Sequence, residues 1–192
     1  MDFLNGIDAI KADPTNGSGL PPVHAWNPPF CGDIDMRIAR DGTWFYEGTP
    51  IGRPALVRLF STILRFDEDG KYYLVTPVEK VGIQVDDAPF VGVRIDRQDG
   101  EHGPEIMVTT NVGDTMVIDR ALPLRVTLAP KTQEPSPYVL VRHNLEALLS
   151  RPAFYELVAL SEIRDIDGEP THGVWSRGQF FPIAPAGAPA DA

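Results

Sequence analysis

Apolar and polar residues alternate along much of the chain, which is the pattern of strands with one buried face. Ile34, Met36 and Ile38 alternate with charged residues, and the dipeptide Asp41-Gly42 then precedes the aromatic run 44–46. Because Asp-Gly suits a type I′ turn, this segment predicts a β-hairpin. Further strands are predicted at 64–66, 72–75, 91–95, 106–110, 116–118, 124–128 and 138–141, with turns at Asp69-Gly70 and Asp99-Gly100.

Two segments have the 3.6-residue period of a helix instead. Pro54 suits the first position of a helix, where its missing N–H is not needed, and apolar residues follow at 56, 57, 59, 60, 63 and 64. Asn144 is predicted to cap a second helical stretch over 145–149, and Pro152 to start a further turn carrying Phe154 and Leu157. Each helix therefore has one apolar face to bury against a sheet.

The chain also partly repeats itself. Residues 53–70 align without a gap with residues 151–168, at a constant shift of 98 and with 7 of 18 positions identical. The repeat predicts a helix followed by a turn, used twice. The predicted fold class is therefore α+β, in two tandem related halves that each pack a helix on mainly antiparallel strands.

The predicted domain limits follow from the repeat and from the proline and glycine content. Prolines and glycines crowd residues 11–32 and 182–192, which predicts irregular structure at both ends. The domains expected are an N-terminal arm over 1–20, an N-terminal α+β domain over 21–82, a longer C-terminal α+β domain over 83–184 and a disordered tail over 185–192.

The charge and cysteine content narrow the possible partners and compartments. The formal net charge is −10. Residues 66–119 alone carry −8, because this segment contains 12 acidic and 4 basic residues. Non-specific nucleic-acid binding depends on Lys and Arg, so it is not expected. Cys31 is the single cysteine and permits no internal disulfide, and neither a secretory signal nor an apolar run near ~20 residues is visible. We therefore expect a cytoplasmic protein without membrane insertion.

No established catalytic motif is present in the sequence. Phosphate-loop, dinucleotide-binding and nucleophile-elbow patterns are missing. The segments 67–70 and 165–168 lack the acids that a calcium loop needs at its first and last positions, so both are interpreted as turns. Cys31 would need a histidine as its base, and no signature pairs it with His24, His102, His143 or His172. The sequence therefore predicts no catalytic residue, no metal site and no cofactor.

Several segments together resemble a known family. They are 31–38 (CGDIDMRI), 41–51 (DGTWFYEGTPI), 74–80 (LVTPVEK) and 173–182 (GVWSRGQFFP), with shorter matches at 87–91, 110–114, 123–126 and 154–158. Over residues 26–183 the chain resembles an uncharacterised bacterial family that is catalogued only as a domain of unknown function. The resemblance implies a duplicated α+β core, a C-terminal half superficially like a pleckstrin-homology fold, and an interface between the halves that binds a ligand or partner in signalling. It implies no reaction and no catalytic residues.

The remaining candidates for a site are arginines and aromatic residues that lie near one another in sequence. Arginine with Trp or Tyr dominates binding hot spots, and helix N-termini favour anions. Taken singly, each aromatic is more commonly a core residue and each arginine a solvated one. The candidate ligand-binding residues are Arg37, Trp44, Tyr46, Arg53, Arg151, Trp175, Arg177 and Phe180.

The leading functional hypothesis is a non-enzymatic regulatory or sensing module in signal transduction. It would bind a small anionic ligand or a protein partner between its two halves, with Arg53 and Arg151 as ligand contacts. One alternative is a hydrolase or transferase with an unrecognised site that uses Cys31 or an Asp/His pair. A third is a sequence-specific nucleic-acid binder, which the charge disfavours. The sequence leaves the oligomeric state open.

Overall fold

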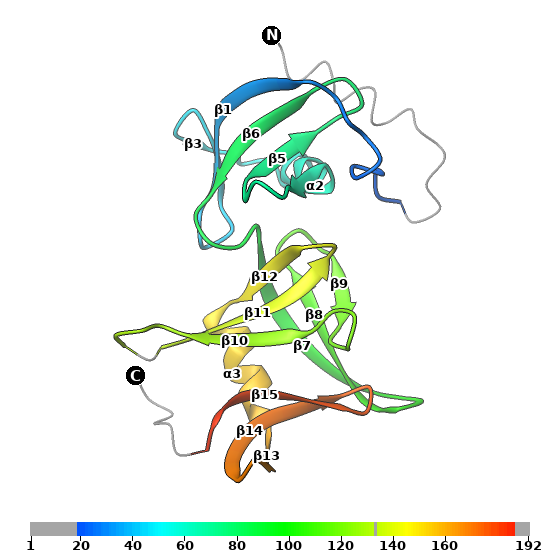
Figure 1. The fold of residues 1–192 in the computed structure, drawn as a ribbon, viewed down its shortest axis with the longest axis vertical. Coiled ribbons are helices and arrows are strands. Elements are labelled where there is room, and N and C mark those ends of the chain that lie inside the picture. The colour runs from blue at the N-terminus through cyan, green and yellow to red at the C-terminus, as the bar shows by residue number, and fades with distance from the viewer. Residues whose placement is uncertain (1–18, 133, 187–192) are drawn as a thin grey trace. The chain divides into compact units, whose positions relative to one another are not determined.

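The computed structural model describes residues 19–132 and 134–186, and these fall into two compact units (Figure 1). The first unit ends at Asp87 and the second begins at Ala88. The predicted boundary at 82 would cut strand β6 (Lys80–Val85), which pairs with strands of the first unit. The ends predicted as an arm and a tail lie mainly outside the described residues.

Within the described residues, the first unit is one six-stranded sheet with one helix. The sheet order is β3-β2-β1-β6-β5-β4, and β1 and β6 are parallel while the other neighbours are antiparallel. Its core includes the stacked rings of Trp44 and Phe60, whose centroids lie 6.2 Å apart. The elements before β6 are β1 (Phe30–Ile38), β2 (Trp44–Tyr46), β3 (Thr49–Pro50), α2 (Pro54–Thr62), β4 (Leu64–Phe66) and β5 (Tyr72–Val75).

The second unit contains two sheets and one helix (Figure 1). The six-stranded sheet has the order β10-β11-β12-β7-β8-β9, and β13-β14-β15 form a separate antiparallel sheet. Helix α3 (Arg151–Ala159) buries Ala153 and Leu157. The strands are β7 (Phe90–Gly100), β8 (Gly103–Thr110), β9 (Thr115–Val117), β10 (Leu124–Leu128), β11 (Pro135–Arg142), β12 (Leu145–Leu149), β13 (Glu162–Ile166), β14 (Glu169–Ser176) and β15 (Gln179–Pro185).

The fold is therefore two tandem units that are mainly β, rather than a balanced α+β architecture. Within the described residues the helices are α2 and α3, of nine residues each. Neither is long and apolar enough to cross a bilayer.

Several local predictions need correction. Leu145–Leu149 is a strand and not a helix, because burial alternates along it: Leu145, Ala147 and Leu149 are buried while the residues between them are half-buried. The turn predicted at Asp99-Gly100 lies later, since Gly100 still pairs with Gly103. Strand β15 also extends to Pro185, into the segment predicted to be irregular.

The turn at Asp41-Gly42 differs from the type I′ prediction. Gly42 has a φ of 83° and donates its N–H to the carbonyl of Ala39, while Asp41 stays at negative φ. The same arrangement recurs at Gly70, whose N–H donates to Asp67 O. Both connections are longer turns closed by a left-handed glycine, which is the second common solution for a hairpin.

The sequence repeat corresponds to a recurring order of elements. Helix α2 is followed by the antiparallel pair β4–β5, and helix α3 by the antiparallel pair β13–β14. The turns differ, because Asp167 and Gly168 both have positive φ and form a two-residue turn, whereas in the first repeat only the glycine does. The first hairpin also belongs to a six-stranded sheet and the second to a three-stranded one.

Candidate functional site

The eight residues selected from the sequence divide between the two units. Arg37, Trp44, Tyr46 and Arg53 belong to the first unit, and Arg151, Trp175, Arg177 and Phe180 belong to the second.

In the first unit, the candidates serve mainly to build the sheet. Trp44 is only 1% exposed, so it is a core residue and not a surface contact for a ligand. Arg37 pairs with Asp86 and lies 4.7 Å from the ring centre of Phe45. Tyr46 is exposed at the end of β2. These contacts give the first unit no convergent set of ligand groups.

The two arginines at the helix starts have different surroundings. Arg53 is exposed at the N-cap of α2, and within the described residues no hydrogen bond or ion pair to its side chain is found. Arg151 is the first residue of α3 and pairs with Glu134 at 2.8 Å. The N-terminus of α3 is capped by Ser150, whose Oγ accepts the N–H of Ala153. Arg151 is therefore already engaged.

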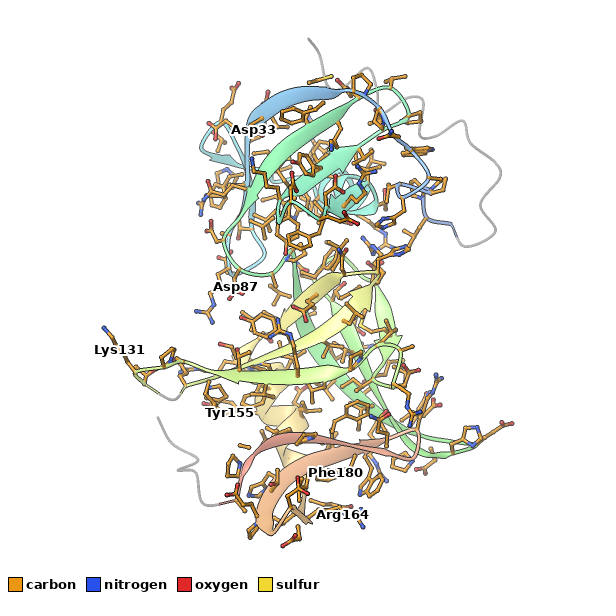
Figure 2. The ribbon with its side chains drawn as sticks, viewed as in Figure 1. Asp33, Asp87, Lys131, Tyr155, Arg164 and Phe180 are labelled. Carbon is orange, nitrogen blue, oxygen red and sulfur yellow. The ribbon has the colours of Figure 1, made fainter. Side chains whose placement is uncertain are left out.

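Three side chains form a stacked row on the outer face of the three-stranded sheet. The rings of Trp175 and Phe180 meet edge to face with centroids 5.5 Å apart, and the guanidinium of Arg164 lies 4.7 Å from the centre of Trp175. Figure 2 labels Arg164 and Phe180 on this sheet. The ring of Phe180 approaches Gly173 so closely that a side chain at position 173 would clash with it. The structure thus brings together Trp175 and Phe180 and adds Arg164, which the sequence reasoning missed.

Arg177 lies at the turn between β14 and β15 and is held by two carboxylates. Its Nε donates to Glu105 at 2.8 Å, and its Nη1 donates to Asp119 at 2.9 Å. The hydrogen bond from Arg177, followed by that from Gln98, lowers the pKa of Glu105. Burial acts to raise the pKa of Asp119, but the N–H groups of Leu122 and Ala121 and the Arg177 side chain hold it below its ordinary value. The same carboxylates raise the pKa of Arg177, Glu105 most strongly.

A cavity of about 360 Å³ opens beside this network. It is bounded by the loop after β9 and by the β14–β15 turn, and its lining residues are Asp119, Arg120, Ala121, Ser176, Arg177, Gly178 and Gln179. Its volume lies within the range of small-molecule sites. Of the two arginines, Arg177 is neutralised by Glu105 and Asp119, whereas Arg120 is exposed and makes no ion pair within the described residues. No pattern along the chain distinguishes Arg120 from the other arginines.

Within the described residues, Cys31 does not hydrogen-bond to a histidine. Cys31 is exposed, and its Sγ contacts the carbonyl of Pro29 at 3.6 Å. His172 instead contacts the hydroxyl of Ser161 at 3.3 Å. In the part of the chain that the structure describes, no cluster of His, Cys, Asp and Glu could hold a metal ion.

Comparison with known proteins identifies relatives but no activity. The model for the N-terminal domain of the DUF1285 family, a domain of unknown function, matches residues 21–88, and the model for its C-terminal domain matches residues 89–183. A crystal structure of a DUF1285 family protein from Silicibacter pomeroyi is 53% identical, with a TM-score of 0.83 and coverage of 95% of this chain and 94% of that chain. A second, from Shewanella baltica, is 30% identical with a TM-score of 0.51, covering 65% of this chain and 90% of that chain. Comparison with curated proteins found no match.

Proposed function

This chain belongs to the DUF1285 family, and from that premise we propose that it is a regulatory or sensing module that binds a small anionic ligand. The observation that carries the proposal is the cavity beside Arg120 and Arg177 in the second unit. It offers a ligand one arginine that is held in place and one whose charge is not yet matched. The proposal also includes a resemblance of the second unit to a pleckstrin-homology fold. It further includes an origin of the two units by duplication and a role in signal transduction.

The charges around the cavity define the class of ligand. Glu105 and Asp119 already supply the carboxylate contacts of Arg177, so that side chain positions the wall and does not need an external anion. Arg120 is left with a full positive charge at the cavity, and an arginine fork matches the oxygens of a carboxylate or a phosphate. A small carboxylate or phosphate monoester would therefore be bound through Arg120.

A thermal-shift experiment tests this proposal with three probes: inorganic phosphate, adenosine monophosphate and succinate. Ligand at about 100 times its dissociation constant stabilises a protein by about 2.7 kcal/mol, which corresponds to a rise in Tm of roughly 5–10 °C for a chain of this size. We expect at least one probe to produce such a rise in the parent. If none of the three probes raises the Tm, binding of these anions by the protein is excluded.

Matched variants locate the binding. Arg120→Gln removes the charge, and Ala121→Phe fills the cavity from an exposed position. Both should abolish the shift, while Arg97→Gln, an exposed arginine whose ion pair with Asp99 is long at 3.8 Å, should keep it. An equal shift in all variants would place the ligand elsewhere.

The sequence hypothesis of a ligand between the halves remains a prediction with its own test. The double variant Arg53→Ala/Arg151→Ala should lose the probe-induced shift if those arginines bind the anion. If the double variant responds like the parent while Arg120→Gln does not, the cavity of the second unit is the site. The hydrolase or transferase alternative stays a hypothesis without assigned residues.

A further inference from the structure

Strand β13 is an open sheet edge with its backbone available on one side. It pairs with β14 and, within the described residues, with no other strand. The other edges are protected by being short or covered: β3 has two residues, β4 and β9 have three each, and β10 and β15 contact each other. Long open edges are where sheets add strands from another chain.

Exposed apolar side chains are concentrated in the segment of the chain that leads into this edge. Ile163 in β13 is 60% exposed and Tyr155 in α3 is 57% exposed, and Val158 and Leu160 are exposed between them in sequence. Figure 2 shows Tyr155 and Arg164 on the part of the second unit that holds α3 and β13. Of the nine large hydrophobic residues exposed in the described chain, these four lie within a single nine-residue segment. Exposed apolar side chains gathered in one segment favour an interaction site there.

The sequence of β13 is complementary to itself in one register only. When two identical antiparallel strands pair about a two-fold axis, one residue lies opposite its own copy and its neighbours cross-pair. Centring on Glu162, Arg164 or Asp165 would place like charges opposite each other, and centring on Ile166 would place Asp165 opposite Asp167. Like charges opposite each other are destabilising. Centring on Ile163 instead places Ile163 against Ile163 and Glu162 against Arg164 twice.

We propose that the partner of this edge is a second copy of the chain, joined by antiparallel pairing of β13 with β13 centred on Ile163. The pairing would extend the three-stranded sheet into one six-stranded sheet across the dimer. It would satisfy the open backbone groups of β13 and bury Ile163, which is 60% exposed, on the axis. The observations that support it are the open edge, the exposed apolar segment and the charge pattern.

Charge reversal tests the register directly in the full chain. Sedimentation equilibrium at about 100 μM should give twice the monomer mass of 21.1 kDa for the parent. Glu162→Arg alone would place an arginine opposite Arg164 of the other copy in both cross-pairs and should weaken association at least tenfold. The double variant Glu162→Arg/Arg164→Glu exchanges the charges and should restore it. A monomeric parent, or a double variant no better than the single one, would overturn the proposal.

A control at another exposed hydrophobic residue distinguishes pairing at this edge from non-specific hydrophobic association. Ile163→Lys places two ammonium groups on the axis and should give a monomer. Val78→Lys alters a residue with the same 60% exposure in the first unit and should leave the dimer unchanged. The melting temperature of each variant is measured as well, because Arg164→Glu removes the contact with Trp175. Glu162→Arg keeps the contact between Arg164 and Trp175, so the effect of Glu162→Arg on association does not depend on the loss of that contact.

Disulfide trapping provides a second readout of the same register. In a Cys31→Ser background, Ile163→Cys places two thiols opposite each other on the axis, and mild oxidation should give a covalent dimer. Ile166→Cys, three residues along β13, would lie opposite Leu160 and should not cross-link. Efficient cross-linking of the Ile166→Cys variant, or none with Ile163→Cys, would contradict the register.

Discussion

The guanidinium of Arg65 forms a two-pronged ion pair with the carboxylate of Asp67, Nε to Oδ1 at 2.6 Å and Nη2 to Oδ2 at 3.0 Å. The remaining Nη1 donates to the carbonyls of Val23 and Trp26, both at 2.9 Å. One buried arginine on strand β4 therefore fastens the segment before β1 to the sheet of the first unit. Lys80 adds a second cation to Asp67 at 3.1 Å.

Replacing Arg65 with Ala should destabilise the first unit strongly. Arg65 is 8% exposed, and its loss would leave two carbonyls without their donor and Asp67 with Lys80 alone. Breaking a buried pair by removing one partner costs about 3–5 kcal/mol, and Asp67 is partly solvated, so we expect roughly 3 kcal/mol. Urea unfolding measures it. Arg94→Ala, which breaks an exposed pair with Asp96, should change stability by less than about 1 kcal/mol.

Asp67 should also give the first unit a stability that falls in acid. Burial acts to raise the pKa of Asp67, but the hydrogen bonds from Arg65 and Lys80 outweigh it and hold the pKa below its ordinary value. Because the folded pKa lies below the unfolded one, this stabilisation is present at pH values above the unfolded pKa of about 3.9 and is lost as the pH falls through the folded pKa. The urea midpoint of Asp67→Asn should therefore change less between pH 7 and pH 3 than that of the parent. Equal changes in both proteins would show that other carboxyl groups dominate.

Tyr73 should ionise late because of its neighbour Asp69. Its hydroxyl donates to Asp69 Oδ2 at 2.5 Å, and this hydrogen bond, with burial, raises the pKa of Tyr73 to about 12. Since the folded pKa exceeds the unfolded value of about 10, the associated stability is complete below pH 10 and is lost as the pH rises towards 12. Absorbance titration of the parent minus that of Tyr73→Phe measures this pKa. Asp69→Asn should shift it back towards 10, and an unchanged value would show that burial alone is responsible.

The local alternation of apolar and polar residues predicted strands well, but it did not predict which distant residues contact one another. The alternation of Ile34, Met36 and Ile38 and the strand at 124–128 were predicted correctly because their periodicity is local. Leucines at 145, 148 and 149 follow a helical spacing, whereas the alternate residues Leu145, Ala147 and Leu149 follow the two-residue period of a strand. The folded unit decides for the strand, because this segment pairs with β11 and β7.

The candidate site was less predictable because its contacts join distant residues. Arg177 meets Glu105 and Asp119, 72 and 58 positions away, so its neutralisation cannot be deduced from the charges next to it in sequence. Trp44 was selected as an aromatic residue that lies near arginines in sequence, yet its pairing opposite Ile38 in the hairpin directs it into the core. Arg120 becomes a candidate only because the folded chain places it in the lining of the cavity.

Trp44 carries a buried indole N–H without a hydrogen-bond partner within the described residues. An unmet buried donor costs about 1–3 kcal/mol. Trp44→Phe removes that donor and keeps a ring next to Phe60, so we expect its stability to lie within about 1.5 kcal/mol of the parent. Trp44→Ala should cost about 3–5 kcal/mol through the cavity it creates. If Phe and Ala cost the same in urea unfolding, the indole volume and not the polar group would govern this site.

Gly173 should resist even the smallest side chain. A Cβ at this position would lie 2.4 Å from the Cζ of Phe180 and 2.5 Å from the carbonyl oxygen of Phe181. The ring can rotate away, but the carbonyl belongs to the backbone of β15 and cannot move without distorting the sheet. Overpacking of this kind costs roughly 1–3 kcal/mol, so Gly173→Ala should lower the Tm of the second unit.

The double variant Gly173→Ala/Phe180→Ala distinguishes the two clashes. Removing the ring relieves only its part of the strain, so the double variant should stay less stable than Phe180→Ala alone. The difference between those two variants measures the clash with the Phe181 carbonyl, since the ring is absent from both. If Gly173→Ala costs nothing in the Phe180→Ala background, the ring alone restricts this position, and the close approach of β14 to β15 does not require a glycine.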